Sequence, residues 1–112
     1  MSQQHDTQSL LGEVHALAEL VEYQAGSIVS RILVKQEKGN VTLFAFDAGQ
    51  ELSEHTAPFD ALVIVLDGEA EVSIEGTARP VAAGQMIIMP ANRPHAVKAP
   101  GRFKMMLVMI RA

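Results

Sequence analysis

The sequence predicts an all-β domain, a sandwich or barrel of short strands preceded by one short helix. From residue 27 onward the chain divides into nine short segments rich in apolar residues, spaced about ten residues apart. Glycine, proline, asparagine and aspartate separate these segments, as they do in turns. Glu69, Glu71 and Ser73 alternate with Ala70 and Val72. This two-residue period is typical of a strand with one wet and one dry face.

Residues 9–22 are expected to form an amphipathic helix. Apolar side chains recur there at helical spacing, namely Leu10, Leu11, Val14, Leu17, Ala18 and Val21. Ser9 is a suitable N-cap, and Gly26 lies a few residues beyond the last apolar position. The stripe has to be buried on the rest of the domain or on a partner subunit. We therefore expect residues 1–26 to be a tail and helix, and residues 27–112 to be the β domain.

The expected strands follow this boundary in order. Their ranges are 27–35, 40–47, 51–56, 61–66, 69–75, 78–82, 85–89, 94–99 and 102–111. Pairs such as Asp67-Gly68 and Glu75-Gly76 supply the turns between them. Residues 62–66 are apolar throughout, which is typical of a strand covered on both faces.

Composition limits the possible functions. A chain of 112 residues suits one domain, and its net charge of −4 argues against a general nucleic-acid binder. The absence of cysteine excludes disulfides, thiolate metal sites and a cysteine nucleophile. The polar N-terminus has no signal-peptide pattern, and no apolar run reaches the roughly 18 residues of a membrane helix. A cytoplasmic protein without a membrane or nucleic-acid partner is expected.

Two spaced motifs carry the functional information. In the first, Gly49 is followed after five residues by His55, then by Ala57, by Ala61 and, after six more residues, by Gly68. In the second, Gly84 is followed by Pro90, Asn92, His95 and Ala99. The spacings resemble those of the paired motifs of the cupin superfamily. The resemblance implies a small cupin-like double-stranded β-helix, a jelly-roll barrel with its pocket at one mouth.

The chain departs from the family pattern at the metal ligands. Cupins commonly hold a divalent metal with two histidines and a glutamate of the first motif and a histidine of the second. Here His55 and His95 remain, whereas Ala57 stands at the second histidine position and Ala61 at the glutamate position. Two imidazoles are two ligands short of a four-coordinate site. Asp60 could supply a carboxylate, but neighbouring strand residues face opposite sides, so the usual register turns it away from Ala61.

Three functions stay open on this sequence. The first is a pocket that binds a small organic molecule, with His55 and His95 as polar anchors and Ala57 and Ala61 leaving apolar space. The second is a metal-dependent cupin enzyme, an oxygenase or isomerase, in which water or an outside group completes the two-histidine site. The third is a non-catalytic module that associates with itself. Whether the protein is an enzyme is left open.

The six methionines are expected to fill irregular core space, although thioethers can also bind Cu(I). Met105 and Met106 are adjacent on one expected strand, so they face opposite sides. Exposed strand edges and the apolar stripe of the N-terminal segment predict a homodimer.

Overall fold

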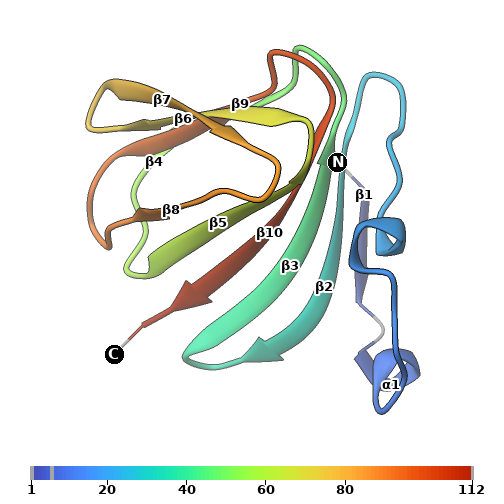
Figure 1. Ribbon diagram of the computed structural model, residues 1–112. Coiled ribbons are helices and arrows are strands. Elements are labelled where there is room, and N and C mark those ends of the chain that lie inside the picture. The colour runs from blue at the N-terminus through green and yellow to red at the C-terminus, as the bar shows by residue number, and fades with distance from the viewer. Residues whose placement is uncertain (1, 6, 112) are drawn as a thin grey trace.

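The computed structural model describes residues 2–5 and 7–111 of the chain, and the side chains of residues 7–111. Two β-sheets face each other, and the N-terminal segment runs along the outer side of the larger one (Figure 1). The elements are β1 (Ser2–His5), α1 (Thr7–Leu10), the 3-10 helix η1 (Leu17–Leu20), β2 (Ile28–Gln36), β3 (Gly39–Phe46), β4 (Glu51–His55), β5 (Asp60–Asp67), β6 (Glu69–Ile74), β7 (Thr77–Ala82), β8 (Met86–Met89), β9 (His95–Lys98) and β10 (Phe103–Ile110).

The strand order confirms the predicted jelly-roll architecture. The larger sheet has the order β1-β2-β3-β10-β5-β8, and the smaller has β4-β9-β6-β7. All nine strands expected after residue 27 are present as β2 to β10, each within about one residue of its expected bounds at either end. The turn residues that separate them therefore predict the element boundaries well.

The core lies between the inner faces of the two sheets. Every second residue of β5 and β6 is buried there, including Val63, Val65 and Val72. At one end of this core Phe46 and Phe103 stack with ring centroids 4.4 Å apart, and both side chains are fully buried. The alternation read in the sequence over 69–75 is thus confirmed, and it orients the smaller sheet with its dry face inward.

The N-terminal segment differs from the prediction. A short helix is present, but it covers Thr7–Leu10, so the predicted range of 9–22 is wrong. Gly12 adopts φ +72°, a left-handed conformation that ends the helix. Val14 is fully exposed rather than part of a buried stripe. Among the described residues no helix is long and apolar enough to cross a membrane.

Tertiary contacts replace the expected helix. Leu17, Leu20 and Val21 pack on Leu43 and Ala45, on the outer face of the larger sheet. Two cations of that sheet also bind carbonyls of the segment. Arg31 donates to the Leu20 oxygen at 3.0 Å, and Lys104 donates to the Ala18 oxygen at 2.7 Å. These bonds satisfy carbonyl groups that a longer helix would have paired internally.

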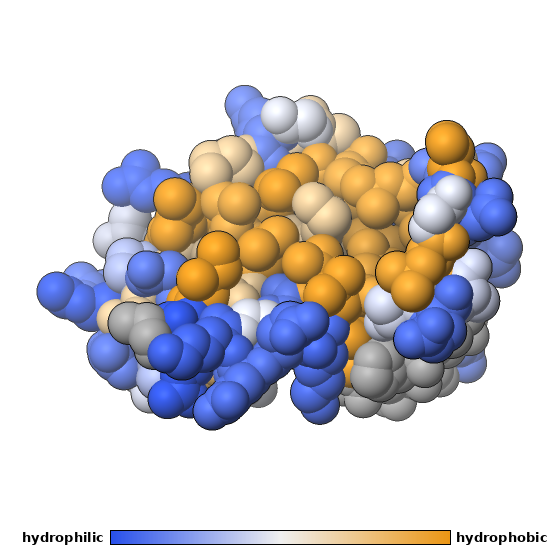
Figure 2. Space-filling model, turned by 90° about the horizontal axis from the view of Figure 1, so that it is seen from below, coloured by the Kyte–Doolittle hydropathy of each residue, from blue (hydrophilic) through white to orange (hydrophobic). Residues whose placement is uncertain are grey.

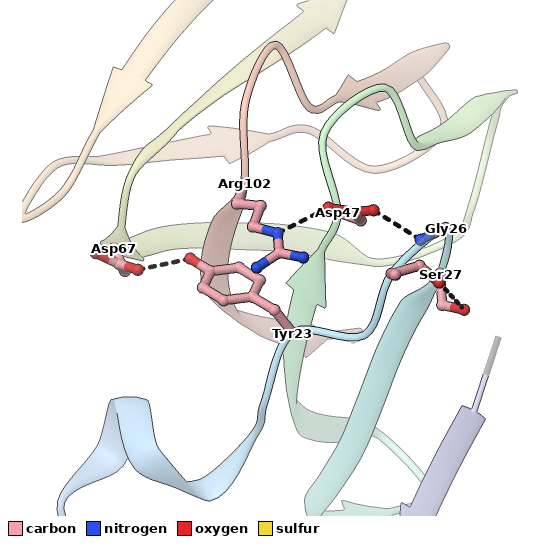
Figure 3. A network of polar contacts seen from close by, with 7 residues as sticks. Tyr23, Gly26, Ser27, Asp47, Asp67 and Arg102 are labelled. Atoms are coloured by element: carbon pink, nitrogen blue, oxygen red, sulfur yellow. Dashed lines mark hydrogen bonds and ion pairs between the residues drawn. The ribbon is translucent and has the colours of Figure 1, made fainter.

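A polar network fixes the end of the segment to the sheet (Figure 3). The Tyr23 hydroxyl donates to Asp67 at 2.6 Å, and the Arg102 guanidinium lies 5.3 Å from the centre of the Tyr23 ring. Asp47 accepts from the Gly26 backbone N–H at 2.6 Å and from Arg102 Nε at 2.8 Å. The Gly26 bond, followed by the Arg102 bond, lowers the pKa of Asp47 from 3.8 to about 2.

This low pKa predicts how acid acts on the Asp47 contact. The folded state prefers the charged carboxylate, so the stability that Asp47 adds is fully present above its ordinary pKa of 3.8 and is lost as pH falls through about 2. We expect the unfolding free energies of the wild type and of Asp47→Asn to differ above this window and to converge within it. Denaturant unfolding of both proteins across the window measures the difference. A gap that is independent of pH would contradict the prediction.

The outer face of the larger sheet is apolar beyond the N-terminal segment. The strand register aligns apolar residues in two rows, Ile88, Leu62, Val108 and Val41 in one and Met86, Ile64 and Met106 in the other, and the second row ends at Leu43 beneath the N-terminal segment. The view from below shows apolar side chains gathered over this side of the molecule (Figure 2). Large apolar patches on a protein surface commonly mark contact sites. The homodimer expected from the sequence stays a prediction.

Candidate functional site

His55 and His95 come together between the two sheets. His55 ends β4 and His95 begins β9, and the two residues are direct partners in the antiparallel register of these strands. Their rings meet edge to face, with centroids 4.5 Å apart and planes at 71°. His95 is 4 % exposed, whereas His55 is open to solvent. The pair therefore has one buried ring and one ring at the entrance.

Both imidazoles are oriented in the same way. The Nδ1 atom of His55 lies 2.7 Å from the Ser53 carbonyl oxygen, and Nδ1 of His95 lies 3.1 Å from the Arg93 carbonyl oxygen. A carbonyl only accepts, so each Nδ1 carries the proton, and in a neutral ring Nε2 then keeps its lone pair. Among the described residues neither Nε2 atom has a hydrogen-bond partner. Two nitrogen lone pairs are thus held ready for a ligand.

The charge state of His95 agrees with this assignment. Burial lowers the pKa of His95 below its ordinary value of 6.5, and a positive charge on His55 would lower it further. The bond to the Arg93 carbonyl acts in the opposite direction but is the smaller effect. His95 is therefore neutral at physiological pH, the form in which an imidazole accepts a hydrogen bond or binds a metal.

The two rings line a small apolar cavity of about 50 Å³. Its other lining residues are Leu52, Ala61, Met89, Val97, Met105, Leu107 and Met109. Ala61 lies between two of the methionines, because its register partners on the neighbouring strands are Met89 and Met109. The small side chain of Ala61 leaves space at this point, as the sequence suggested.

Two loops close the rim beside the histidines. The carbonyl of Ala57 accepts from the Asn92 backbone N–H at 2.8 Å, and the carboxylate of Asp60 accepts from the Ala91 backbone N–H at 2.9 Å. Asn92 has φ +63°, a conformation that asparagine tolerates better than most residues. These bonds tie the segment after β4 to the loop before β9, beside the two histidines.

Not every residue singled out from the sequence lines the cavity. His55, His95 and Ala61 do, whereas Ala57 lies in the loop after β4 and Asp60 is the first residue of β5. Asp60 is exposed and its carboxylate binds the loop backbone rather than facing Ala61. The methionines were expected to fill the core, with Cu(I) binding as the alternative. The two-residue period of a strand places Met105 and Met109 on one face of β10, so the sequence could have predicted that both line the site.

The comparisons with known proteins agree with this architecture. Residues 42–111 match the family described as Cupin domain. This chain belongs to the cupin superfamily. No curated protein matches it.

Solved structures show the same fold. A conserved protein of unknown function from Streptococcus pyogenes is 39 % identical with a TM-score of 0.87, over 90 % of this cupin and 89 % of that chain. A cupin 2 conserved barrel domain protein from Leptotrichia buccalis is 44 % identical with a TM-score of 0.85 over 87 % of this cupin, which spans only 47 % of that chain. A cupin superfamily protein from Desulfitobacterium hafniense is 27 % identical with a TM-score of 0.85, over 90 % of this cupin and 93 % of that chain.

The residues present do not fit the divalent metal site common in cupins. Among the described residues no group of three or more His, Cys, Asp or Glu is placed to hold a metal ion. The lining of the cavity supplies two imidazoles and no carboxylate. Hard divalent ions prefer oxygen donors, and a four-coordinate zinc site would lack two of its ligands.

Proposed function

We propose that this cupin is a binding protein whose site is the His55–His95 pair at the mouth of the barrel. One observation carries the proposal: two imidazoles line one apolar cavity, each is held by a backbone carbonyl through Nδ1, and neither Nε2 has a hydrogen-bond partner within the described part of the chain. Small-molecule sites combine apolar walls with a few placed polar groups in the same way. The two rings are the polar anchors of the proposed ligand.

The cavity limits the ligand's size and chemistry. A volume of about 50 Å³ is far below the several hundred Å³ of pockets that enclose a drug-sized molecule. Only a small head group enters, and the rest of the ligand stays at the entrance beside His55. Because Nε2 of a neutral ring accepts, the head group has to donate a hydrogen bond. A hydroxyl, an N–H or a protonated acid on a compact organic molecule meets these conditions.

Phenol and toluene form a matched pair of probes for this proposal. They share one ring shape, but only phenol donates a hydrogen bond. We expect phenol to shift the ¹⁵N resonances of Nε2 in His55 and His95, with Nδ1 protonated in the free protein, whereas toluene leaves these resonances unchanged. Losing one such hydrogen bond in His55→Ala should weaken phenol binding by about two- to tenfold.

His15 supplies the internal control. Its ring contacts the Leu10 carbonyl at 3.0 Å and is remote from the cavity, so its resonances and the His15→Ala variant should respond to neither probe. Equal responses to phenol and toluene, or a phenol site that survives His55→Ala at full affinity, would remove the imidazole pair from the proposed function.

A further inference from the structure

Three thioethers share the cavity with the two imidazoles. Met89, Met105 and Met109 come from β8 and β10 of the larger sheet, and His55 and His95 come from the smaller sheet opposite. The three methionines make up half of the six in the chain. Packing alone does not require them here, since leucine fills strand cores with better-defined rotamers.

The register places two of these thioethers beside the absent carboxylate. Met89 on β8 and Met109 on β10 are the cross-strand partners of Ala61, one on each side. Ala61 stands at the position that carries the glutamate in the cupin motif. Ala61 therefore supplies no oxygen ligand, and its two neighbours across the strands carry sulfur donors.

The charge of the lining also selects among metals. None of the nine described lining residues is acidic. A divalent ion would bring two uncompensated charges into an apolar cavity. The Born cost rises with the square of the charge, so a monovalent ion costs about a quarter as much. A soft monovalent ion with nitrogen and sulfur ligands fits this donor set.

We propose that His55, His95, Met89 and Met109 form a binding site for Cu(I). Thioether and imidazole are donors that Cu(I) accepts, and the Nδ1 contacts to backbone carbonyls leave the lone pair on Nε2 of each neutral ring. His55 is exposed at the entrance, which gives the ion a path from solvent to the buried ring and the thioethers. The inference rests on the imidazole pair of the proposed function and assigns it a metal ligand.

A competition titration tests the site. Under anaerobic, reducing conditions the protein is titrated against the coloured Cu(I)–bicinchoninate complex, and the loss of colour gives stoichiometry and affinity. We expect the wild type to withdraw one Cu(I) per chain. The Met89→Leu/Met109→Leu double variant should bind at least about tenfold more weakly. Exchange of methionine for leucine nearly conserves volume, so this variant should fold, which circular dichroism and its melting temperature verify.

Two methionines outside the cavity supply the matched control. Met86 and Met106 lie on the outer face of the larger sheet, so Met86→Leu/Met106→Leu should bind Cu(I) like the wild type. X-ray absorption of the loaded wild type should show both nitrogen and sulfur around copper. No uptake by the wild type, or equal loss in the two double variants, would overturn the inference.

Repeating the phenol titration separates this inference from the proposed function. If phenol shifts the histidine resonances but the wild type takes up no Cu(I), the copper site is wrong and the organic ligand stands. If Cu(I) binds through the thioethers but phenol fails, the copper site stands and the organic ligand is wrong.

Discussion

Phe103→Ala should lower the free energy of unfolding by about 3–5 kcal/mol. The Phe103 ring is fully buried and stacks on Phe46 at 4.4 Å, so its removal leaves a cavity and also breaks an aromatic pair. Since a domain of this size has only about 5–15 kcal/mol of stability, much of the folded population would be lost. Urea unfolding followed by circular dichroism measures the change.

Phe59→Ala is the matched control for this deletion. Phe59 is only half-buried, and the Arg111 guanidinium lies 5.6 Å from the centre of its ring. The same truncation should cost about 1 kcal/mol there, because little cavity is left. Similar losses of unfolding free energy in the two variants would show that burial and stacking of Phe103 add little to stability.

Gly68→Ala should destabilise the protein by about 2–5 kcal/mol through backbone strain and overlap together. Gly68 has φ +73°, and a Cβ atom there would overlap the Arg102 carbonyl oxygen and lie 3.0 Å from Phe103 Cα. Both atoms belong to the backbone close to the bulge at the start of β10, so movement of a side chain cannot relieve the overlap. Unfolding in urea, with the melting temperature as a second measure, shows the loss.

Gly76→Ala separates the two causes. Gly76 has a similar φ of +83°, but nothing lies within 4 Å of the Cβ position. This variant should therefore cost only the left-handed strain, about 1–2 kcal/mol. If it costs as much as Gly68→Ala, the close approach of the chain at Arg102 does not matter for stability.

The strands could be predicted because local and tertiary preferences agree there. Over β6 the alternation that marks a strand is the same alternation that fills the core, and Asp67-Gly68 ends β5 with a residue able to adopt positive φ. The helix predicted over residues 9–22 was wrong because local and tertiary preferences disagree there. Gly12 interrupts the helical pattern with a positive φ, and the outer face of the larger sheet buries Leu17 and Val21 without a continuous helix.

The site was predicted in part. Motif spacing placed His55 and His95 in one hollow, and the structure brings their rings together. Spacing does not reveal which ring nitrogen is free, since that depends on backbone carbonyls two residues earlier in the chain. It also does not reveal that Met89 and Met109 flank Ala61, because that depends on the pairing of β8, β5 and β10.

The two imidazoles differ in how firmly the barrel holds them. β4 lies at the free edge of the smaller sheet, and its register with β9 is interrupted between Leu52 and His55. His95 lies on an inner strand with neighbours on both sides. His55 can therefore swing outward by loosening a single strand end, while His95 stays fixed. A ligand of the proposed site would then enter and leave without opening of the barrel, at a rate set by fraying of the β4 end.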